Sequence, residues 1–455
     1  MNKGEKRLKP RKRGRLTKLF SRYVSVFHHP LYYRNFYIVG RENMPEDGNP
    51  VVLVSNHQNC LIDPMALVFA LTDRKPHFLT RASVFANPLF DKILREFGCL
   101  PTYRAKVDGV RGVSKNKGTL EEVAVALSHG ETVALYPEGQ HQNKRWLGAF
   151  SQAYLKMAFG AAEETNFEKE VYVMPSAHHY SHYRLPREEM MVLFGEPIAL
   201  SPYYEEYKEH PREVMSKVND LVREQILGMM LNVEDLEHYE EIDFLRLGAF
   251  GKAFAERNSL NPNFLPDKLK ADKLLVARLA KATEEKPEEM AELFGEVKSV
   301  ARDMKRLGLR DWLFEGRRTV GGLLLWALGM LALLPLFGAS LAATWFIFLV
   351  PLVVNTLFIK DRQFRGSINL AATLLVTYPL SSLVPAIVML CNGLWIETLG
   401  FLMVLPALLI FAINYMRWAT KLFGYARFVL GGRKKIHRLA HLRATLYNKL
   451  KEIVG

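Results

Sequence analysis

A histidine and an aspartate, His57 and Asp63, lie six positions apart in the segment VVLVSNHQNCLIDP. The run VVLVS predicts a buried strand, and Pro64 suits the first helical position with Asp63 as its N-cap. Residues six apart on one helix point about 120° away from each other, so the two can meet only if His57 lies on the preceding loop. An aspartate that accepts from one imidazole nitrogen leaves the other to deprotonate a hydroxyl. The alternative is that Asp63 is only an N-cap of the helix, and that His57 is a turn residue with a hydrogen bond to the backbone.

Three further segments carry residue types suited to a phosphorylated substrate. They follow in the order GCLPTYR (98–104), YPEG (136–139) and VMPSA (173–177). Arg104 ends the first of them, and its planar guanidinium can donate to two phosphate oxygens at once. The alternative role for Arg104 is a surface ion pair, which contributes little to stability.

In this order, the four segments resemble the four sequence blocks of the glycerolipid acyltransferase family, which contains glycerol-3-phosphate and 1-acylglycerol-3-phosphate acyltransferases. The resemblance covers roughly residues 34–200. It implies that His57 is the general base, that Asp63 orients it and that Arg104 binds phosphate. It also implies an α/β domain with a mixed sheet and flanking helices, a glycerophosphate acceptor, and acyl-CoA or acyl-carrier protein as donor without a cofactor.

The YPEG and VMPSA segments supply the other substrate ligands that the resemblance implies. The Glu138 carboxylate resembles a ligand for glycerol hydroxyls, and Gly139 permits close approach of the backbone. The Gln and His that follow replace the Thr and Arg or Ser common in the family, so we expect phosphate contacts to shift to Lys144 or Arg145. Pro175 resembles part of the acyl-binding wall. The alternatives are a solvated basic loop for the two cations and a strand-end turn for the proline.

The spacing of the catalytic pair differs from the common family pattern. That pattern has four residues between His and Asp, whereas five lie between His57 and Asp63. The arrangement H-x-N-x-x-x-D-P, completed by Asn59 and Pro64, resembles the fungal-type glycerol-3-phosphate and dihydroxyacetone-phosphate acyltransferases. The acceptor, the donor and the chain-length preference stay open at this point.

The histidines His178, His179 and His182 invite a metal interpretation. No acidic or cysteine residue is spaced with them as a further ligand, and the resemblance implies no metal. We therefore expect none. The three cysteines show no metal-ligand or redox spacing, which predicts free thiols in a reducing compartment.

Strand and helix patterns alternate over residues 35–198, where runs such as VVLVSN, TVALYP and MMVLFG are separated by helical stretches. This alternation predicts an α/β domain. Beyond it, the strand patterns vanish and apolar residues recur at helical intervals. We expect five parts, in this order: a basic N-terminal segment (1–33), the acyltransferase domain (34–200), a helical middle region (201–318), a transmembrane region (319–416) and a basic cytosolic tail (417–455).

Residues 319–359 contain no charge, and 366–416 contain only Glu397. Runs of this length predict about four membrane spans, although the first two are short and can instead form a re-entrant pair. The expected spans are 320–337, 341–359, 367–390 and 393–415. Lys and Arg gather before the first span, between the second and third, and after the fourth. The positive-inside rule then predicts a multi-pass membrane protein whose catalytic domain is cytosolic, and the N-terminus lacks the apolar core of a secretory signal.

The formal net charge is +14, and nine of the first 18 residues are Lys or Arg. Such a segment attracts anionic membrane lipid, by about 1 kcal/mol for each charge near the surface. The charge also admits a nucleic-acid-binding membrane protein, but the tail has no interleaved aromatic residues, so we expect no nucleic acid. A transporter is disfavoured because Glu397 is the only acidic group in the apolar spans. Acylation of another lysolipid or of an amino-acid lipid is the remaining alternative.

Overall fold

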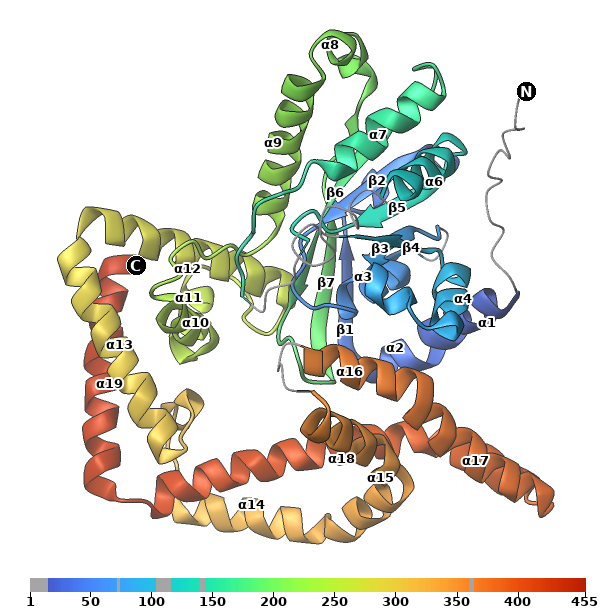
Figure 1. Ribbon diagram of the computed structural model, residues 1–455. Coiled ribbons are helices and arrows are strands. Elements are labelled where there is room, and N and C mark those ends of the chain that lie inside the picture. The colour runs from blue at the N-terminus through green and yellow to red at the C-terminus, as the bar shows by residue number, and fades with distance from the viewer. Residues whose placement is uncertain (1–14, 72–73, 104–115, 140–143, 360–363) are drawn as a thin grey trace. The chain divides into compact units, whose positions relative to one another are not determined.

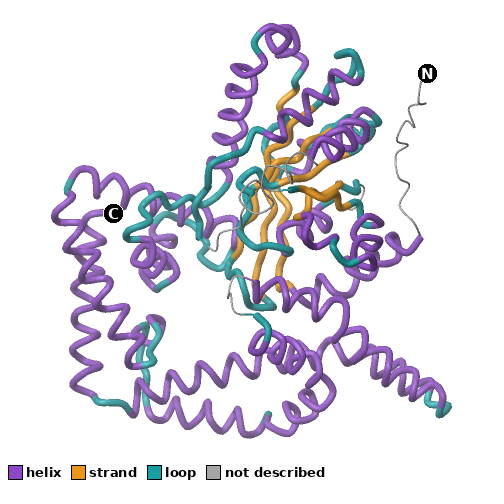
Figure 2. The backbone as a smooth tube through the Cα atoms, in the orientation of Figure 1, coloured by secondary structure: helices purple, strands orange, loops and turns teal. Residues whose placement is uncertain are grey.

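The computed structural model describes residues 15–71, 74–103, 116–139, 144–359 and 364–455. The chain divides into two compact units. The first comprises residues 1–230 and 361–370, and the second comprises 231–360 and 371–455. The described strands all belong to the first unit, whereas the described part of the second is helical (Figures 1 and 2).

One mixed sheet forms the centre of the first unit, as predicted. Its strands are β1 (Tyr33–Val39), β2 (Val51–Ser55), β3 (His77–Arg81), β4 (Cys99–Thr102), β5 (Thr132–Leu135), β6 (Tyr172–Tyr180), β7 (Glu188–Phe194) and β8 (Ile198–Ala199). The order is β1-β7-β6-β2-β5-β3-β4, with β8 beside β6. Strands β6, β2, β5, β3 and β4 run parallel, whereas β7 is antiparallel to β6 and parallel to β1. The five parallel strands therefore bring their carboxyl ends to one edge of the sheet.

The helices of the first unit flank this sheet. They are α1 (Arg15–Tyr23), α2 (His29–Tyr32), α3 (Ile62–Ala70), α4 (Pro88–Glu96), α6 (Asn116–Ser128), α7 (Ala153–Glu164), α8 (Tyr204–Glu209) and α9 (Pro211–Met229). Helices α6, α7 and α9 lie along the sheet (Figure 1) and share a core with Val52 and Val54 of β2. Leu53, between them, is equally buried. Because β2 is covered on both faces, its sequence is a continuous apolar run instead of an alternating one.

The second unit contains α10 (Tyr239–Leu247), α11 (Ala249–Arg257), α12 (Leu265–Glu285), α13 (Pro287–Leu307), α14 (Val320–Ala332), α15 (Leu334–Leu357), α17 (Tyr378–Cys391), α18 (Trp395–Leu430) and α19 (Arg433–Val454). Helix α16 (Arg365–Ala372) begins in the first unit. The predicted middle region is helical, but its first helices, α8 and α9, belong to the first compact unit together with the sheet. The predicted boundaries at residues 200 and 318 stay predictions.

Three helical stretches among the described residues are long and apolar enough to cross a membrane. They are Leu334–Leu357, Arg365–Cys391 and Trp395–Leu430. The first predicted span instead forms α14, which has 13 residues and falls short of the roughly 17 that a crossing needs. The expected spans place a break at residues 338–340, but the break is at Leu333, because a proline is tolerated in the first turn of α15. Four crossings therefore stay a prediction.

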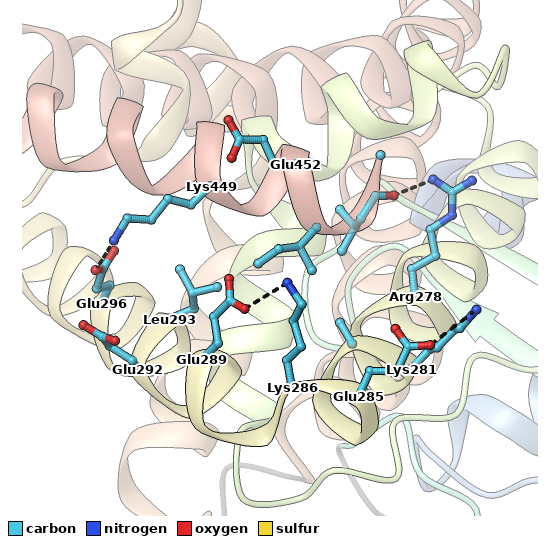
Figure 3. Close-up of a pocket in the computed structure, with 14 residues that line it drawn as sticks. Arg278, Lys281, Glu285, Lys286, Glu289, Glu292, Leu293, Glu296, Lys449 and Glu452 are labelled. Carbon is cyan, nitrogen blue, oxygen red and sulfur yellow. Dashed lines mark hydrogen bonds and ion pairs between the residues drawn. The ribbon is translucent and has the colours of Figure 1, made fainter.

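A cavity of about 790 Å³ lies among α12, α13 and α19 of the second unit (Figure 3). Charges pair along its walls, with Lys449 and Glu296 at 2.6 Å and Lys286 and Glu289 at 3.1 Å. None of the residues that line it is a histidine, serine or cysteine. Its polar lining is made of lysine, arginine and glutamate side chains.

Candidate active site

The His57 and Asp63 side chains meet at the carboxyl end of β2, with Nδ1 of His57 2.7 Å from Oδ2 of Asp63. His57 lies on the loop before α3 and Asp63 in the first turn of that helix, as the spacing requires. One detail of the prediction is wrong. The helix begins at Ile62 and Leu61 is its N-cap, so Asp63 does not cap it. Its carboxylate instead accepts hydrogen bonds from two amides of the preceding loop, and the helix begins one residue before Asp63.

Four donors surround the Asp63 carboxylate. Oδ2 accepts from His57 Nδ1 and from the backbone amides of Gln58 and Asn59, both at 2.8 Å. Oδ1 accepts from the hydroxyl of Tyr180, near the end of β6. The carboxylate is fully buried, so these bonds take the place of solvation by water. The Asp63 side chain thus links α3 to the loop and to β6 through hydrogen bonds.

The ionisation of Asp63 follows from these contacts. Burial alone raises the pKa of the carboxyl group, but the hydrogen bond from His57, the charges of His178 and His57, and the bond from Tyr180 outweigh burial. The net result is a pKa of Asp63 below its ordinary value. The carboxylate is therefore ionised at neutral pH and accepts the Nδ1 proton of His57. Nε2 is then the nitrogen through which the ring can take up a proton.

The His57 ring is held from its face as well as from its edge. It stacks on Tyr136, with ring centroids 4.3 Å apart and an interplanar angle of 17°. The His57 side chain is 15% exposed, whereas that of Asp63 is 0% exposed. The pair thus combines a buried carboxylate with an accessible imidazole, an arrangement that suits proton transfer to or from a bound molecule.

Glu138 lies on the turn after β5 and also contacts His57. Its Oε1 accepts from the backbone amide of His57 at 2.8 Å, and its Oε2 accepts from that of Gly148 at 2.9 Å. Burial raises the pKa of Glu138, and these two bonds oppose the increase. The predicted contact with glycerol hydroxyls stays a prediction. Gly139, at φ +65°, closes the turn by donating to the carbonyl of Tyr136 at 3.1 Å, and no atom of the described residues lies within 4 Å of a Cβ atom added to it.

Of the two predicted phosphate ligands that follow, Arg145 is buried and Lys144 is partly exposed. Arg145 donates to the carbonyl of Tyr180 at 3.0 Å, and its guanidinium lies 4.9 Å from the centre of the Tyr183 ring. A solvated basic loop therefore does not describe Arg145. The structure uses this arginine to fix the end of β6, and its role as a phosphate ligand stays a prediction.

Pro175 and Arg104 complete the predicted set. Pro175 is in the middle of β6, paired with Val54 of β2, and its carbonyl accepts from Gly195 at 2.9 Å. It is therefore a strand residue and not part of a strand-end turn. Its role in binding an acyl chain stays a prediction. Arg104 lies outside the residues that the structure describes.

Of the three histidines considered as metal ligands, His178 and His179 lie on β6 and His182 follows it. Among the described residues, no group of three or more His, Cys, Asp or Glu side chains is arranged to hold a metal ion. His178 is buried beside the catalytic pair. Burial lowers its pKa to about 4, the Asp63 charge opposes the change and His57 adds to it. A neutral His178 fits a packing role, and the expectation that no metal is needed stays a prediction.

Two contributions to the site were absent from the sequence analysis: the Tyr180 hydroxyl and the Gly148 amide. The sequence contained a signal for Tyr180, because this residue lies five positions after Pro175 on a strand that extends beyond the end of β2. An extended strand after the VMPSA segment predicts that later side chains reach past the loop of His57. Gly148 acts through its backbone amide, so there was no such signal for it.

Comparison with known proteins gives matches to the part of the chain that holds this site. Residues 35–179 match the sequence model of the acyltransferase family. Glycerol-3-phosphate O-acyltransferase 2 of Saccharomyces cerevisiae is 29% identical over 30% of this chain and 17% of its own length. Chloroplastic 1-acyl-sn-glycerol-3-phosphate acyltransferases of Arabidopsis thaliana and Brassica napus are 31% and 30% identical, over 32% and 31% of this chain and 40% and 41% of their own.

These matches therefore span less than half of each curated relative. Among solved structures, the 1-acyl-sn-glycerophosphate acyltransferase of Thermotoga maritima is similar at 18% identity and a TM-score of 0.34. That similarity covers 48% of this chain and 83% of the other.

Proposed function

This chain carries a domain of the glycerolipid acyltransferase family over residues 35–179, and from this premise we propose that it transfers a fatty acyl group from a thioester to a glycerophosphate hydroxyl. The observation that carries the proposal is the 2.7 Å contact between His57 and the buried Asp63, inside the matched segment. Acyl transfer from a thioester to an alcohol needs a base at the hydroxyl and no cofactor. An imidazole with one edge accessible provides that base.

In the proposed mechanism, Nε2 of His57 accepts the proton of the acceptor hydroxyl while the hydroxyl oxygen attacks the thioester carbonyl carbon. Asp63 stabilises the imidazolium that forms, because its charge and its bond to Nδ1 favour the protonated ring. The tetrahedral intermediate then breaks its carbon–sulfur bond. The departing thiolate takes the proton back from His57, so the products are an ester and a free thiol, and the histidine returns to its neutral form.

For the phosphate of the acceptor, we propose Arg104 and Lys144 as the first ligands to test. Arg145 already donates to the Tyr180 carbonyl and lies over the Tyr183 ring. A phosphate dianion close to a cation gains several kcal/mol at about 4 Å in a partly solvated site. Removing a cation that binds it is therefore expected to raise KM for the acceptor more than it lowers kcat.

The donor and the location belong to the same proposal. We propose acyl-CoA or acyl-carrier protein as the donor, a role in phospholipid biosynthesis, and a multi-pass membrane protein with a cytosolic catalytic domain. Three apolar helices of spanning length support the membrane location. Glycerol 3-phosphate and 1-acylglycerol 3-phosphate are the acceptors that the names of the relatives suggest.

The test is acyl transfer by the detergent-purified chain with each donor and, separately, with glycerol 3-phosphate, dihydroxyacetone phosphate and 1-acylglycerol 3-phosphate. Glycerol serves as the phosphate-free control. We expect one phosphorylated acceptor to be acylated far faster than glycerol. Equal rates with glycerol would contradict the proposed binding of phosphate. An amino-acid lipid is assayed in the same way, and its acylation without that of any glycerophosphate would favour the alternative acceptor.

A further inference from the structure

The loop between β2 and α3 is held on two sides. On one side, the Asp63 carboxylate accepts from the amides of Gln58 and Asn59. On the other side, Ser367 Oγ accepts from the amide of Leu61 at 3.0 Å and donates to the carbonyl of Asn59 at 3.4 Å. A single hydroxyl therefore uses both its donor and its acceptor capacity on the loop that presents the base.

The residue before Ser367 fits closely against the same loop. A Cβ atom added to Gly366 would lie 2.8 Å from the carbonyl oxygen of Tyr183 and 3.4 Å from Oδ1 of Asn59. The same Tyr183 carbonyl accepts from Nδ2 of Asn59 at 2.7 Å, and the hydroxyl of Tyr32 donates to the carbonyl of Gly366 at 3.4 Å. Glycine is the residue that allows this approach, because any side chain would displace the backbone it touches.

The loop needs such support because of its backbone conformation. Cys60 has a φ of +38°, a region that residues other than glycine rarely adopt. A backbone of this kind persists only where its surroundings fix it. Ser367 is 4% exposed and Asn59 is 1% exposed, so little water can replace the hydrogen bonds between them.

From these contacts we propose that Gly366 and Ser367 are positioning residues of the active site, and that they hold the loop so that His57 and Asp63 keep their contact. Ser367 lies 306 residues after Leu61, at the beginning of an apolar helical stretch. The acyltransferase segment therefore contains the reacting groups but not all of their framework. This inference rests on the proposed role of His57 as the general base.

The first test compares Ser367→Ala with Ser381→Ala in the full chain. Ser381 is a matched control, because it is a buried serine further along the same apolar stretch and its hydroxyl has no hydrogen-bond partner in the described structure. We expect Ser367→Ala to lower kcat about ten-fold while KM for both substrates stays nearly unchanged. Ser381→Ala should keep the kcat of the parent, and Ser367→Thr, which retains the hydroxyl, should restore most of it.

The second test measures hydrogen–deuterium exchange of the amides in residues 58–61, with or without detectable acyl transfer. We expect faster exchange in Ser367→Ala than in the parent and in Ser381→Ala. Parent-like kcat and exchange in Ser367→Ala would overturn the inference, as would a Ser367→Thr variant that falls as far as the alanine variant. If the parent acylates no glycerophosphate, the proposed function fails, and the exchange experiment still decides whether Ser367 fixes the loop.

Discussion

At the residue scale, the site depends on one buried carboxylate. Asp63 accepts from His57, from two loop amides and from Tyr180, and it has no exposed surface. Each donor removes part of the cost of burying the charge, and the charge in turn orients the imidazole. Residues that surround Asp63 should therefore affect catalysis even where they touch no substrate.

We expect Asp63→Asn to lower kcat by about 10³-fold with little change in KM, because an amide keeps the shape but cannot accept from every donor or stabilise an imidazolium. One of its two polar groups is itself a donor and would face an N–H or O–H group. Initial rates at saturating substrate, with the thermal unfolding midpoint as a check on folding, measure the effect. A variant with most of the kcat of the parent would show that His57 does not need an anionic partner.

Tyr180→Phe is expected to lower kcat about ten-fold, since one oxygen of the buried Asp63 then lacks a donor. Loss of this donor should make protonation of the coupled Asp63–His57 pair easier, so the acidic limb of the pH–rate profile should shift to higher pH. Tyr154→Phe is the matched control, because that buried hydroxyl donates to Asn219 at 3.0 Å and lies in the core of the sheet unit. An unshifted profile in Tyr180→Phe would contradict the role assigned to its hydroxyl.

Buried histidines predict a loss of stability on acidification. Burial, with a smaller effect of His29, lowers the pKa of His28 to about 3, and burial lowers that of His29 to about 4 from the ordinary 6.5. Between these values and 6.5, the unfolded chain binds more protons than the folded chain. Each histidine therefore removes up to about 1.4 kcal/mol of stability per pH unit as the pH falls. The unfolding midpoint in detergent should decrease between about pH 7 and about pH 5, and less steeply in His28→Phe. A flat dependence would contradict this account.

At the element scale, the parallel strands explain why residues far apart in sequence converge. The loops of His57 and Glu138 follow β2 and β5, which are neighbours in the sheet, and Tyr180 ends β6 on the other side of β2. Because these strands run in the same direction, their carboxyl ends share one edge. Turns such as the one between α6 and β5 lead the chain from the helices into these strands.

Gly130, between α6 and β5, shows how tightly one such turn is built. Its φ is +81°, and a Cβ atom there would overlap the carbonyl oxygen of Gly48. We expect Gly130→Ala to destabilise the protein by about 2 kcal/mol or more, because both the backbone conformation and the space exclude a side chain. Gly118→Ala lies inside α6, where no atom of the described residues is within 4 Å of an added Cβ atom, and it should be neutral or slightly stabilising. Thermal unfolding of the two variants measures the difference, and equal midpoints would contradict it.

The sequence predicted the elements better than their ends and contacts. The apolar run of β2 and the spacing of His57 and Asp63 were enough to place the pair at a strand-to-helix junction. The helix start was wrong because the carboxylate of Asp63 bonds back to the loop, an interaction that propensity does not contain. The roles of Tyr180 and Ser367 depend on tertiary contacts between segments that are distant in sequence. No local pattern predicts the contact of Ser367, whereas the length of the strand after the VMPSA segment was a signal for Tyr180.

At the scale of the whole molecule, the apolar helices expose large hydrophobic side chains, which is unfavourable in water. Leu325, Ile396 and Met403 are 73%, 85% and 71% exposed on helices with almost no charge. Large apolar faces of this kind mark a contact with membrane or protein, and three stretches have the length to span a bilayer. The membrane location and its orientation are therefore testable with the intact chain.

Cys391 offers that test, because it is exposed at the end of α17, between two of the spanning stretches. If the catalytic domain is cytosolic, this cysteine lies on the opposite side of the membrane. A membrane-impermeant maleimide should then label Cys391 in intact cells, and Cys391→Ser should abolish the labelling. Labelling only after permeabilisation would contradict the predicted orientation.

The central claim is that His57 is the base in acyl transfer to a glycerophosphate. The most direct measurement is the rate of ester formation by the purified chain and its His57→Ala variant, with the acceptor on which the parent is most active. We predict transfer by the parent and a loss of about 10³-fold or more in the variant, with unchanged thermal unfolding. A variant as active as the parent, or a parent inactive with every glycerophosphate, would contradict the account.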